Sequence, residues 1–482
     1  MARIIFLLCA IAALAYSVSA KPDKVVCYYG SWAVYRQGYG KFPVESIDPF
    51  KCTHAIYTFV GIGSDGSIRI LDSWNEIDLG AIRRFNALKN KNSNLKTLIA
   101  IGGWNEGSQV FSQVAANSGL RQKFAQNALA FIQKHGFDGF DLDWEYPAQR
   151  GGASYDKQNV VLMVEALRKT FDATGNKYLV TAAVAATASA ADISYNIPAF
   201  AANLDFINLM AYDLHGPFDG RTGQNAPLYS SDSLNVDASV KAWLSRGAPA
   251  NKIVLGVPVY GRSFTVSNTA SLGSNNGLNI PANAGTPGPF TAEAGMLGYN
   301  EICLLKQQGG WTEIWDNNQK VPAMYKGNQW VGFDNERSIR MKAEYAIAMN
   351  LGGAMIWSIE TEDIHGFCGR SYPILSTINE AFFGSSNANP GSGSSGSVTT
   401  SKPVTTSTPK ATTTTTTTTK APIIGNDRTD CSTAGYIRDA DDCNVYHYCQ
   451  NYEIIHSLKC PSGLVFNDHL WACDWPYNVP EC

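Results

Sequence analysis

The stretch FDGFDLDWEYP, residues 137–147, carries four acidic side chains among large apolar ones: Asp138, Asp141, Asp143 and Glu145. Side chains alternate between the two faces of a strand, so Asp141, Asp143 and Glu145 share one face and Asp138 lies on the other. Because neighbouring carboxyl groups in an apolar setting do not all ionise, at least one of them should have a raised pKa. A carboxyl group that keeps its proton near neutral pH can act as a general acid. The pattern therefore predicts catalysis at the end of a buried strand.

A solvated acidic loop and a cation site are the alternatives for this stretch. Phe140, Leu142 and Trp144 alternate with the acids, which is not typical of a solvated loop. A calcium loop would place Gly and Asn between its acids over a longer span. For Asp138, whose side chain points the other way, we expect a structural hydrogen-bonding role.

Segments with strand character recur through residues 21–384, and amphipathic helical patterns, clearest over 120–135 and 155–170, separate many of them. The eight predicted strands are 24–30, 53–60, 95–103, 137–145, 178–185, 204–213, 252–261 and 352–360. Alternating strands and helices predict a (β/α)8 or TIM barrel, in which the ends of the strands carry the chemistry. An open doubly wound sheet is the alternative, but no Gly-rich phosphate fingerprint follows the first strand.

The remaining segments predict further parts of the chain. Residues 263–335 are too long for a βα loop and indicate a small α+β insertion between strands 7 and 8. Residues 1–20, with Arg3, an apolar run and a small-residue site ending at Ala20, are typical of a secretory signal peptide. A membrane anchor is the alternative, but the run is shorter than the ~20 residues needed. Residues 385–428 read as a Ser/Thr/Pro-rich, O-glycosylated linker before a small domain at 429–482.

The cysteines agree with export. Ten of the 11 cysteines remain once Cys9 leaves with the signal peptide, and six of these crowd into residues 431–482. This density predicts a disulfide-stapled domain, although spacing alone permits fifteen pairings. Zinc is the alternative, since three histidines lie nearby, but CxxC spacing is absent and the compartment is oxidising. The histidines are His447, His456 and His469.

Residues 137–145 resemble the Asp-Gly-x-Asp-x-Asp-x-Glu signature of family 18 glycoside hydrolases, the chitinases. Four further segments resemble motifs of that family: LIAIGGW (98–104), LMAYDLHG (209–216), GVPVYGRSF (256–264) and GGAMIWSIE (352–360). The insertion between strands 7 and 8 is also typical of this group. The C-terminal segment resembles the peritrophin-A type of chitin-binding domain, so the resemblance covers the whole mature chain.

The resemblance implies a role for each residue of the signature. Glu145 would give a proton to the glycosidic oxygen, Asp143 would orient the acetamido group of the substrate, and Asp141 would share a proton with Asp143. Tyr212 would bind the acetamido oxygen, with Asp213 and Met210 lining the pocket. The family is retaining but substrate-assisted, so the substrate's own acetyl oxygen attacks the anomeric carbon. The implied substrate is β-1,4-linked N-acetylglucosamine, and we expect neither a cofactor nor a metal.

Aromatic side chains are often core residues, but those at strand ends suit stacking on sugar rings. The predicted substrate-binding residues are Tyr28, Trp32, Phe59, Gly102, Gly103, Trp104, Tyr146, Met210, Phe218, Tyr260, Arg262 and Trp357. Three positions depart from the family pattern: Phe218 stands where many relatives have Trp, and Glu360 and Glu362 stand where relatives often have Asp. These departures leave the catalytic set intact.

The resemblance also implies disulfides and a second binding face. The expected pairs are Cys27–Cys52, Cys303–Cys368, Cys431–Cys449, Cys443–Cys482 and Cys460–Cys473. In the small domain the candidates for contact with chitin are Tyr446, Tyr448, Trp471 and Trp475, some of which must instead fill its small core.

Together these features predict a secreted, endo-acting chitinase that is a monomer. Its partners would be chitin and chitooligosaccharides; the net charge of −3 argues against nucleic acid, and no membrane binding is expected. The alternative is a chitin-binding lectin or growth-factor-like protein on an inactive chitinase fold. Such proteins typically lack the final Glu of the signature, which is present here. Cleavage of N-glycan cores is a third possibility, but it fits poorly with a chitin-binding domain.

Overall fold

Eight parallel strands, rich in Val, Ile, Leu and Ala, close into a barrel in this computed structural model, which confirms the predicted TIM barrel. β1 pairs with β15 on one side and with β2 on the other, and this double pairing closes the ring. The barrel strands are β1 Lys24–Gly30, β2 His54–Ile62, β4 Lys96–Gly102, β5 Gly139–Asp143, β6 Leu179–Ala185, β7 Phe206–Met210, β8 Ile253–Pro258 and β15 Gly353–Trp357. A short strand, β3 Ile68–Ile70, runs antiparallel to β2.

The structure describes residues 21–384 and, further along the chain, residues 435–439, 441–450, 453–460, 463–467, 472–474, 476 and 479. The predicted signal peptide and the whole of the predicted linker, residues 1–20 and 385–428, lie outside these ranges. By its internal contacts the chain forms two compact units that divide between residues 393 and 394.

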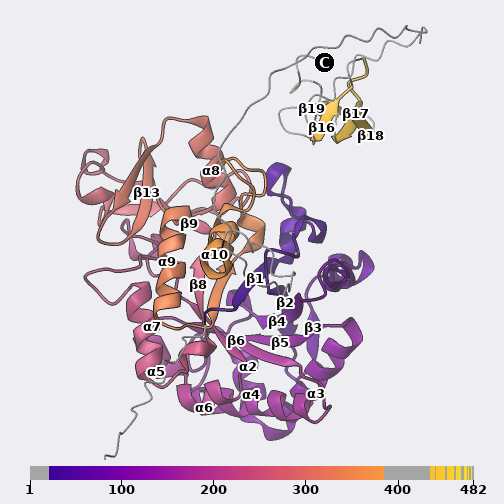
Figure 1. Ribbon diagram of the computed structural model, residues 1–482, viewed down its shortest axis with the longest axis vertical. Helices are drawn as coiled ribbons and strands as arrows, with labels where there is room; N and C mark the ends of the chain where they lie inside the picture. The colour runs from indigo at the N-terminus through magenta and orange to yellow at the C-terminus, as the bar shows by residue number, and fades with distance from the viewer. Residues whose placement is uncertain are drawn as a thin grey trace, which may run out of the picture. The chain divides into compact units, whose positions relative to one another are not determined.

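Helices cover the outer face of the barrel, and Figure 1 shows α2, α3, α4 and α6 along the outside of strands β4 to β6. The helices of the barrel layer are α1 Ala81–Asn86, α2 Gln109–Ala116, α3 Ser118–His135, α4 Asp156–Asp172, α5 Ala188–Ser194, α6 Ile197–Ala202, α7 Val236–Ser245, α9 Glu336–Ala348 and α10 Pro373–Phe383. α3 illustrates how sequence sets their limits. The Asn117 side chain accepts a hydrogen bond from the Leu120 amide at its start, and Gly136 (φ 78°) ends it in the left-handed region.

The barrel strands are apolar on both faces because helices cover the outside and packed side chains fill the inside. Along β5, the outward-facing Phe140 and Leu142 are buried in the main core, and Phe140 packs edge-on against Phe124 of α3. The inward-facing residues Asp141 and Asp143 are also buried. The interior of this barrel therefore carries buried carboxyl groups on a strand whose outer face is apolar.

The insertion is a second sheet with its own small core. Its strands, in the order β10-β9-β14-β13-β12 with β11 beside β9, are all antiparallel. The sheet begins three residues earlier than the predicted insertion, since Tyr260 already belongs to it, and it ends at Gly332. The elements are β9 Tyr260–Val266, β10 Ala282–Ala284, β11 Met296–Gly298, α8 Tyr299–Gln308, β12 Thr312–Asp316, β13 Val321–Lys326 and β14 Gln329–Gly332. In Figure 1 this segment lies at one side of the barrel.

The C-terminal unit contains two small antiparallel sheets. β16 Gly435–Arg438, β17 Val445–Gln450 and β18 Glu453–Lys459 form one, and β19 Val465–Asn467 and β20 Ala472–Asp474 form the other. Both ring nitrogens of the buried His447 have partners, Ser457 Oγ at 2.7 Å and Asp439 Oδ2 at 2.8 Å.

Three of the five predicted disulfides are present: Cys27–Cys52, Cys303–Cys368 and Cys460–Cys473. The predicted pairs Cys431–Cys449 and Cys443–Cys482 involve residues outside the described ranges and stay predictions. Over the described ranges, no helix combines the length and the apolarity that crossing a bilayer requires.

Candidate active site

The three inward-facing acids of the signature follow one another up β5, as the alternation predicts. Asp141 and Asp143 lie within the strand, and Glu145 follows at its carboxyl end, where it is partly exposed. The outward-facing Trp144 is buried, stacks on Phe111 and donates from Nε1 to Ser108 Oγ at 3.0 Å. Packing of Trp144 therefore holds Glu145 toward the barrel mouth.

Asp138 has the structural role expected for it. Its Oδ2 accepts from the Thr97 amide at 2.8 Å and from Lys89 Nζ at 2.9 Å, on the side of the strand away from the other acids. These bonds tie β5 to β4 and to the helix layer.

Asp141 is fully buried and receives several hydrogen bonds. The Tyr28 hydroxyl donates to Oδ2 at 2.7 Å, while Thr181 Oγ1 and Asn208 Nδ2 donate to Oδ1, the latter at 3.3 Å. Burial raises the pKa of Asp141 to about 6, against these three donors, which lower it. The carboxylate of Asp141 is thus held in one orientation directly below Asp143.

Asp143 and Glu145 form the reactive end of the row. Burial, then the charges of Glu145 and Asp141, raise the pKa of Asp143 well above its usual value. Its Oδ1 is buried and has no hydrogen-bond partner among the described residues. Burial raises the pKa of Glu145 to about 7, while a hydrogen bond with Tyr146 and the charge of Arg150 oppose that rise. A carboxyl group protonated near neutral pH and an unpartnered carboxyl oxygen beneath it can give a proton and bind a polar group together.

Gly102 and Gly103 are required by the close approach of β4 to the site. Both have positive φ, 113° and 81°. A Cβ at Gly102 would come within 2.1 Å of the Asp143 carbonyl oxygen, and one at Gly103 within 2.7 Å of the Phe59 ring. Larger residues would displace Asp143 or Phe59.

The other side of the site is built around Asp213, which follows β7. Its Oδ1 accepts from the Tyr260 hydroxyl and from Arg262 Nε, both at 2.7 Å. Asp213 itself has φ 54°, an unfavourable conformation that the Asn225 side chain stabilises by accepting from its amide at 2.9 Å. The neighbouring Tyr212 hydroxyl lies 3.9 Å from the Met355 sulfur, a weak acceptor, and so can turn to a stronger partner.

Aromatic rings gather where β15, β1 and β2 end, because these strands are neighbours in the barrel. The ring centre of Trp357 lies 5.9 Å from that of Phe59 and 6.3 Å from that of Trp32. Trp32, Trp104 and Phe218 are 41%, 58% and 68% exposed, respectively. The predicted residues Tyr146 and Met210 are half-buried. Exposed rings around buried carboxyl groups form a surface suited to sugar rings.

Two of the aromatic residues predicted to contact substrate are buried in the barrel. Tyr28 and Tyr260 are only 1% and 2% exposed, and their hydroxyl groups donate hydrogen bonds to Asp141 and Asp213, respectively. The reason is that both lie within strands, where neighbouring strands and side chains cover the ring. Their structural part is to hold the two aspartates.

In the small domain the structure describes little of the predicted binding face. Tyr446 is half-buried, and its ring stacks on Phe466 with centres 4.4 Å apart. Trp471 and Trp475 lie outside the described residues, and so does the side chain of Tyr448.

Sequence reasoning missed four residues that organise the site: Thr181, Asn208, Asn225 and Arg150. Thr181 and Asn208 are polar residues at inward positions of apolar strands, and this signal could have identified them. Nothing in the sequence marks Asn225 or Arg150, which reach the site from loops.

Of the three departures from the family pattern, Phe218 is exposed, whereas Glu360 and Glu362 are buried and accept hydrogen bonds. Glu360 accepts from the Gly30 amide at 3.0 Å and from Ser358 Oγ at 2.6 Å. Glu362 accepts from the Leu375 amide at 2.8 Å. Glu360 thus ties the segment after β15 to the end of β1, and Glu362 ties it to the start of α10.

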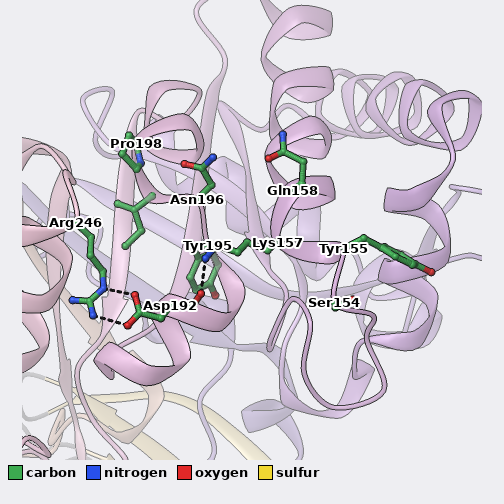
Figure 2. Close-up of a pocket in the computed structure, with 10 residues that line it drawn as sticks. Ser154, Tyr155, Lys157, Gln158, Asp192, Tyr195, Asn196, Pro198 and Arg246 are labelled. Carbon is green, nitrogen blue, oxygen red and sulfur yellow. Dashed lines mark hydrogen bonds and ion pairs between the residues drawn. The ribbon is translucent and has the colours of Figure 1, made fainter.

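A separate pocket of about 590 Å³ lies between the start of α4 and the segment from α5 to α6, and Figure 2 shows its lining. Both carboxylate oxygens of Asp192 are held by Arg246, at 2.7 and 2.6 Å, and these bonds lower the pKa of Asp192.

A closed β/α barrel with a row of carboxyl groups at one strand end and exposed aromatic rings around them defines the class of barrel glycoside hydrolases. Residues 24–362 match Glycosyl hydrolases family 18, and residues 431–482 match the Chitin binding Peritrophin-A domain. The chain belongs to family 18 of the glycosyl hydrolases.

Individual proteins agree with this assignment. The Endochitinase of Manduca sexta is 37% identical over 389 residues, which is 77% of this chain and 70% of that one. The crystal structure of the Ostrinia furnacalis Group IV chitinase has a TM-score of 0.72 at 46% identity and covers 74% of this chain and 99% of its own. Human YKL-39, described as a pseudo-chitinase that retains chitooligosaccharide binding, has a TM-score of 0.68 at 34% identity, over 75% of this chain and 99% of its own.

Proposed function

We propose that this protein is a secreted, endo-acting chitinase that hydrolyses β-1,4-linked N-acetylglucosamine with retention of configuration. The observation that carries the proposal is Glu145, partly exposed at the end of β5, with a pKa raised to about 7 and the unpartnered Oδ1 of Asp143 beneath it. The similarity to chitinases and the match of residues 431–482 to a chitin-binding domain support chitin as the substrate.

In this mechanism Glu145 gives its proton to the glycosidic oxygen as the bond to the anomeric carbon breaks. The acetamido oxygen of the substrate attacks that carbon, and an oxazolinium ion forms. Asp143 accepts a hydrogen bond from the acetamido N–H through its free oxygen, and Tyr212 donates to the acetamido oxygen. Glu145, now a carboxylate, removes a proton from the water that opens the ring, so the configuration is retained.

The exposed rings support endo action on a long chain. Trp32, Trp104 and Phe218 are well exposed and come from three different loops around the carboxyl row. On such a surface a polymer can lie across the site, so that cleavage is not confined to the end of the polymer chain. We also propose that the protein is exported after cleavage at Ala20, acts as a monomer and binds neither nucleic acid nor membranes.

The alternative function is chitin binding without catalysis, for which similarity to YKL-39 is the specific observation. Release of the fluorophore from a fluorogenic chitobioside by the secreted protein distinguishes the two. Binding with no release would establish the lectin and contradict the enzyme.

The hydrolysis of chitotetraose should be lost on the alkaline side of about pH 7. Because burial raises the pKa of Glu145 to about 7, the donor is protonated below that pH and loses its proton above it. We expect kcat/KM to fall about tenfold per pH unit beyond this point. Initial rates between pH 4 and about pH 9, with unfolding followed in parallel, would test this. A rate unchanged to about pH 9 would exclude Glu145 as the proton donor.

Removing residues 385–482 should lower the rate of hydrolysis of insoluble chitin and leave the hydrolysis of short soluble oligomers nearly unchanged. The small domain would raise the local concentration of polymer without changing the chemical barrier. We expect turnover of chitotetraose within about twofold of wild type and a loss of about tenfold on insoluble chitin at low enzyme concentration.

The comparison needs both substrates and a pull-down on chitin. Equal damage to both activities would make the small domain part of the barrel fold or its site. If neither activity changes and retention on chitin persists, residues 431–482 are not a chitin-binding domain.

A further inference from the structure

Arg150 joins two strand ends at the mouth of the barrel. It lies in the turn after β5, and its Nη1 donates to the carbonyl oxygen of Trp104 at 2.8 Å and to that of Glu145 at 2.9 Å. Its guanidinium carbon also lies 3.5 Å from the centre of the Trp104 ring, a cation–π contact. One exposed side chain thus contacts both Trp104, the second residue after β4, and the proposed proton donor.

These bonds extend the hydrogen bonding between β4 and β5 beyond the last pair of backbone groups. β4 and β5 pair as far as Gly102 and Asp143, and the Gly103 amide then donates to the Asp143 carbonyl at 2.8 Å. One and two residues further on, the carbonyl groups of Trp104 and Glu145 receive the Arg150 guanidinium group instead. A guanidinium group can lie flat on a ring while one of its nitrogens donates to two carbonyl groups, whereas a lysine ammonium group has donors but no planar face to stack.

The turn that presents Arg150 is held from below. Ala148 and Arg150 have positive φ, 62° and 50°, which is unfavourable for residues with a side chain. The buried Asp156 stabilises the turn, since its Oδ2 accepts from the Ala153 amide at 2.7 Å and its Oδ1 accepts from Ser112 Oγ at 2.8 Å. The backbone of Arg150 is therefore held in place, although its side chain is exposed.

We propose that Arg150 is a positioning residue that aligns the Trp104 ring with the backbone of Glu145, so that a sugar stacked on Trp104 and the proton donor keep one fixed geometry. The proposal rests on the function given above and specifies how one subsite is connected to the chemistry. It assigns Arg150 no contact with the reacting atoms.

The charge of Arg150 supplies a readout that a merely structural residue would not change. The charged and titratable groups that face Glu145 are Asp143 in β5, Tyr146 and Arg150 beyond it, Tyr195 after α5, and Tyr212 and Asp213 after β7. Among these, the Arg150 charge lowers the pKa of Glu145 and the Asp213 charge raises it. Without the Arg150 charge, the alkaline limb of the rate profile should move to higher pH.

The test compares Arg150→Gln, which removes both charge and stacking, with Arg150→Lys, which keeps the charge. Arg84→Gln is the matched control, because it removes a partly exposed arginine of α1 and its ion pair with Glu45, in another part of the barrel layer. For chitohexaose we expect kcat/KM of Arg150→Gln to fall about tenfold and its alkaline limb to rise by about half a pH unit. For Arg150→Lys we expect kcat/KM to fall about threefold or more, while the alkaline limb of its pH profile stays at the wild-type pH.

Binding gives a readout that does not need activity. In a Glu145→Gln background, titration with chitohexaose followed by tryptophan fluorescence should show about fivefold weaker binding when Arg150 is also Gln. If the wild type fails to cleave chitohexaose, the proposed function is wrong, and this titration still tests the alignment of Trp104. A folded Arg150→Gln variant with the rate, pH limb and affinity of the wild type would overturn the inference, as would a lowered Tm with all three unchanged.

Discussion

Glu145→Gln should lower kcat on chitotetraose by about three powers of ten or more. The amide keeps the shape of the side chain but has no proton to give to the glycosidic oxygen, and afterwards it cannot take one from water. Both halves of the reaction are therefore lost together. Binding of chitin oligomers should survive, because the aromatic surface of Trp32, Trp104 and Trp357 is unchanged.

Asp138→Asn is the matched control for this variant. It makes the same change from acid to amide in the same stretch of eleven residues, but on the face that bonds Thr97 and Lys89. We expect a lower Tm with kcat within a few fold of wild type. If Glu145→Gln keeps more than about a tenth of wild-type turnover, Glu145 is not the proton donor.

Fully deacetylated chitosan should not be cleaved at a measurable rate. The proposed nucleophile is the acetamido oxygen of the substrate, and a free amine at that position cannot form the oxazolinium ion. The Tyr212 hydroxyl would likewise lose the acetyl oxygen to which we propose that it donates. Reducing-end assays on chitosan and chitin oligomers of equal length would measure the difference.

The same mechanism predicts that products released from chitin oligomers first carry the β configuration. Proton NMR in the first minutes of reaction distinguishes the anomers before they equilibrate. An initial α-anomer would mean inversion, with water attacking directly. Cleavage of fully deacetylated oligomers would mean that the acetamido oxygen is not the nucleophile.

The sequence by itself was enough to predict the barrel and the carboxyl row. Near-continuous apolar strands alternating with amphipathic helices indicated the architecture, because only a sheet covered on both faces buries such strands. The two-residue period of a strand was enough to separate Asp141, Asp143 and Glu145 from Asp138. These inferences succeeded because they depend on local geometry, which neighbouring residues determine.

The partners of those acids were decided only by the tertiary structure. Tyr28, Thr181 and Asn208 meet at Asp141 from β1, β6 and β7, and no local pattern specifies which inward positions face one another across a closed barrel. The pattern places the rings of Tyr28 and Tyr260 near strand ends but does not show what covers them, and in the folded chain they are 1% and 2% exposed. Their contact with the sugar stays a prediction. Arg150 reaches Trp104 and Glu145 because a turn with two positive φ values is held by a buried aspartate, and that is a property of the folded chain alone.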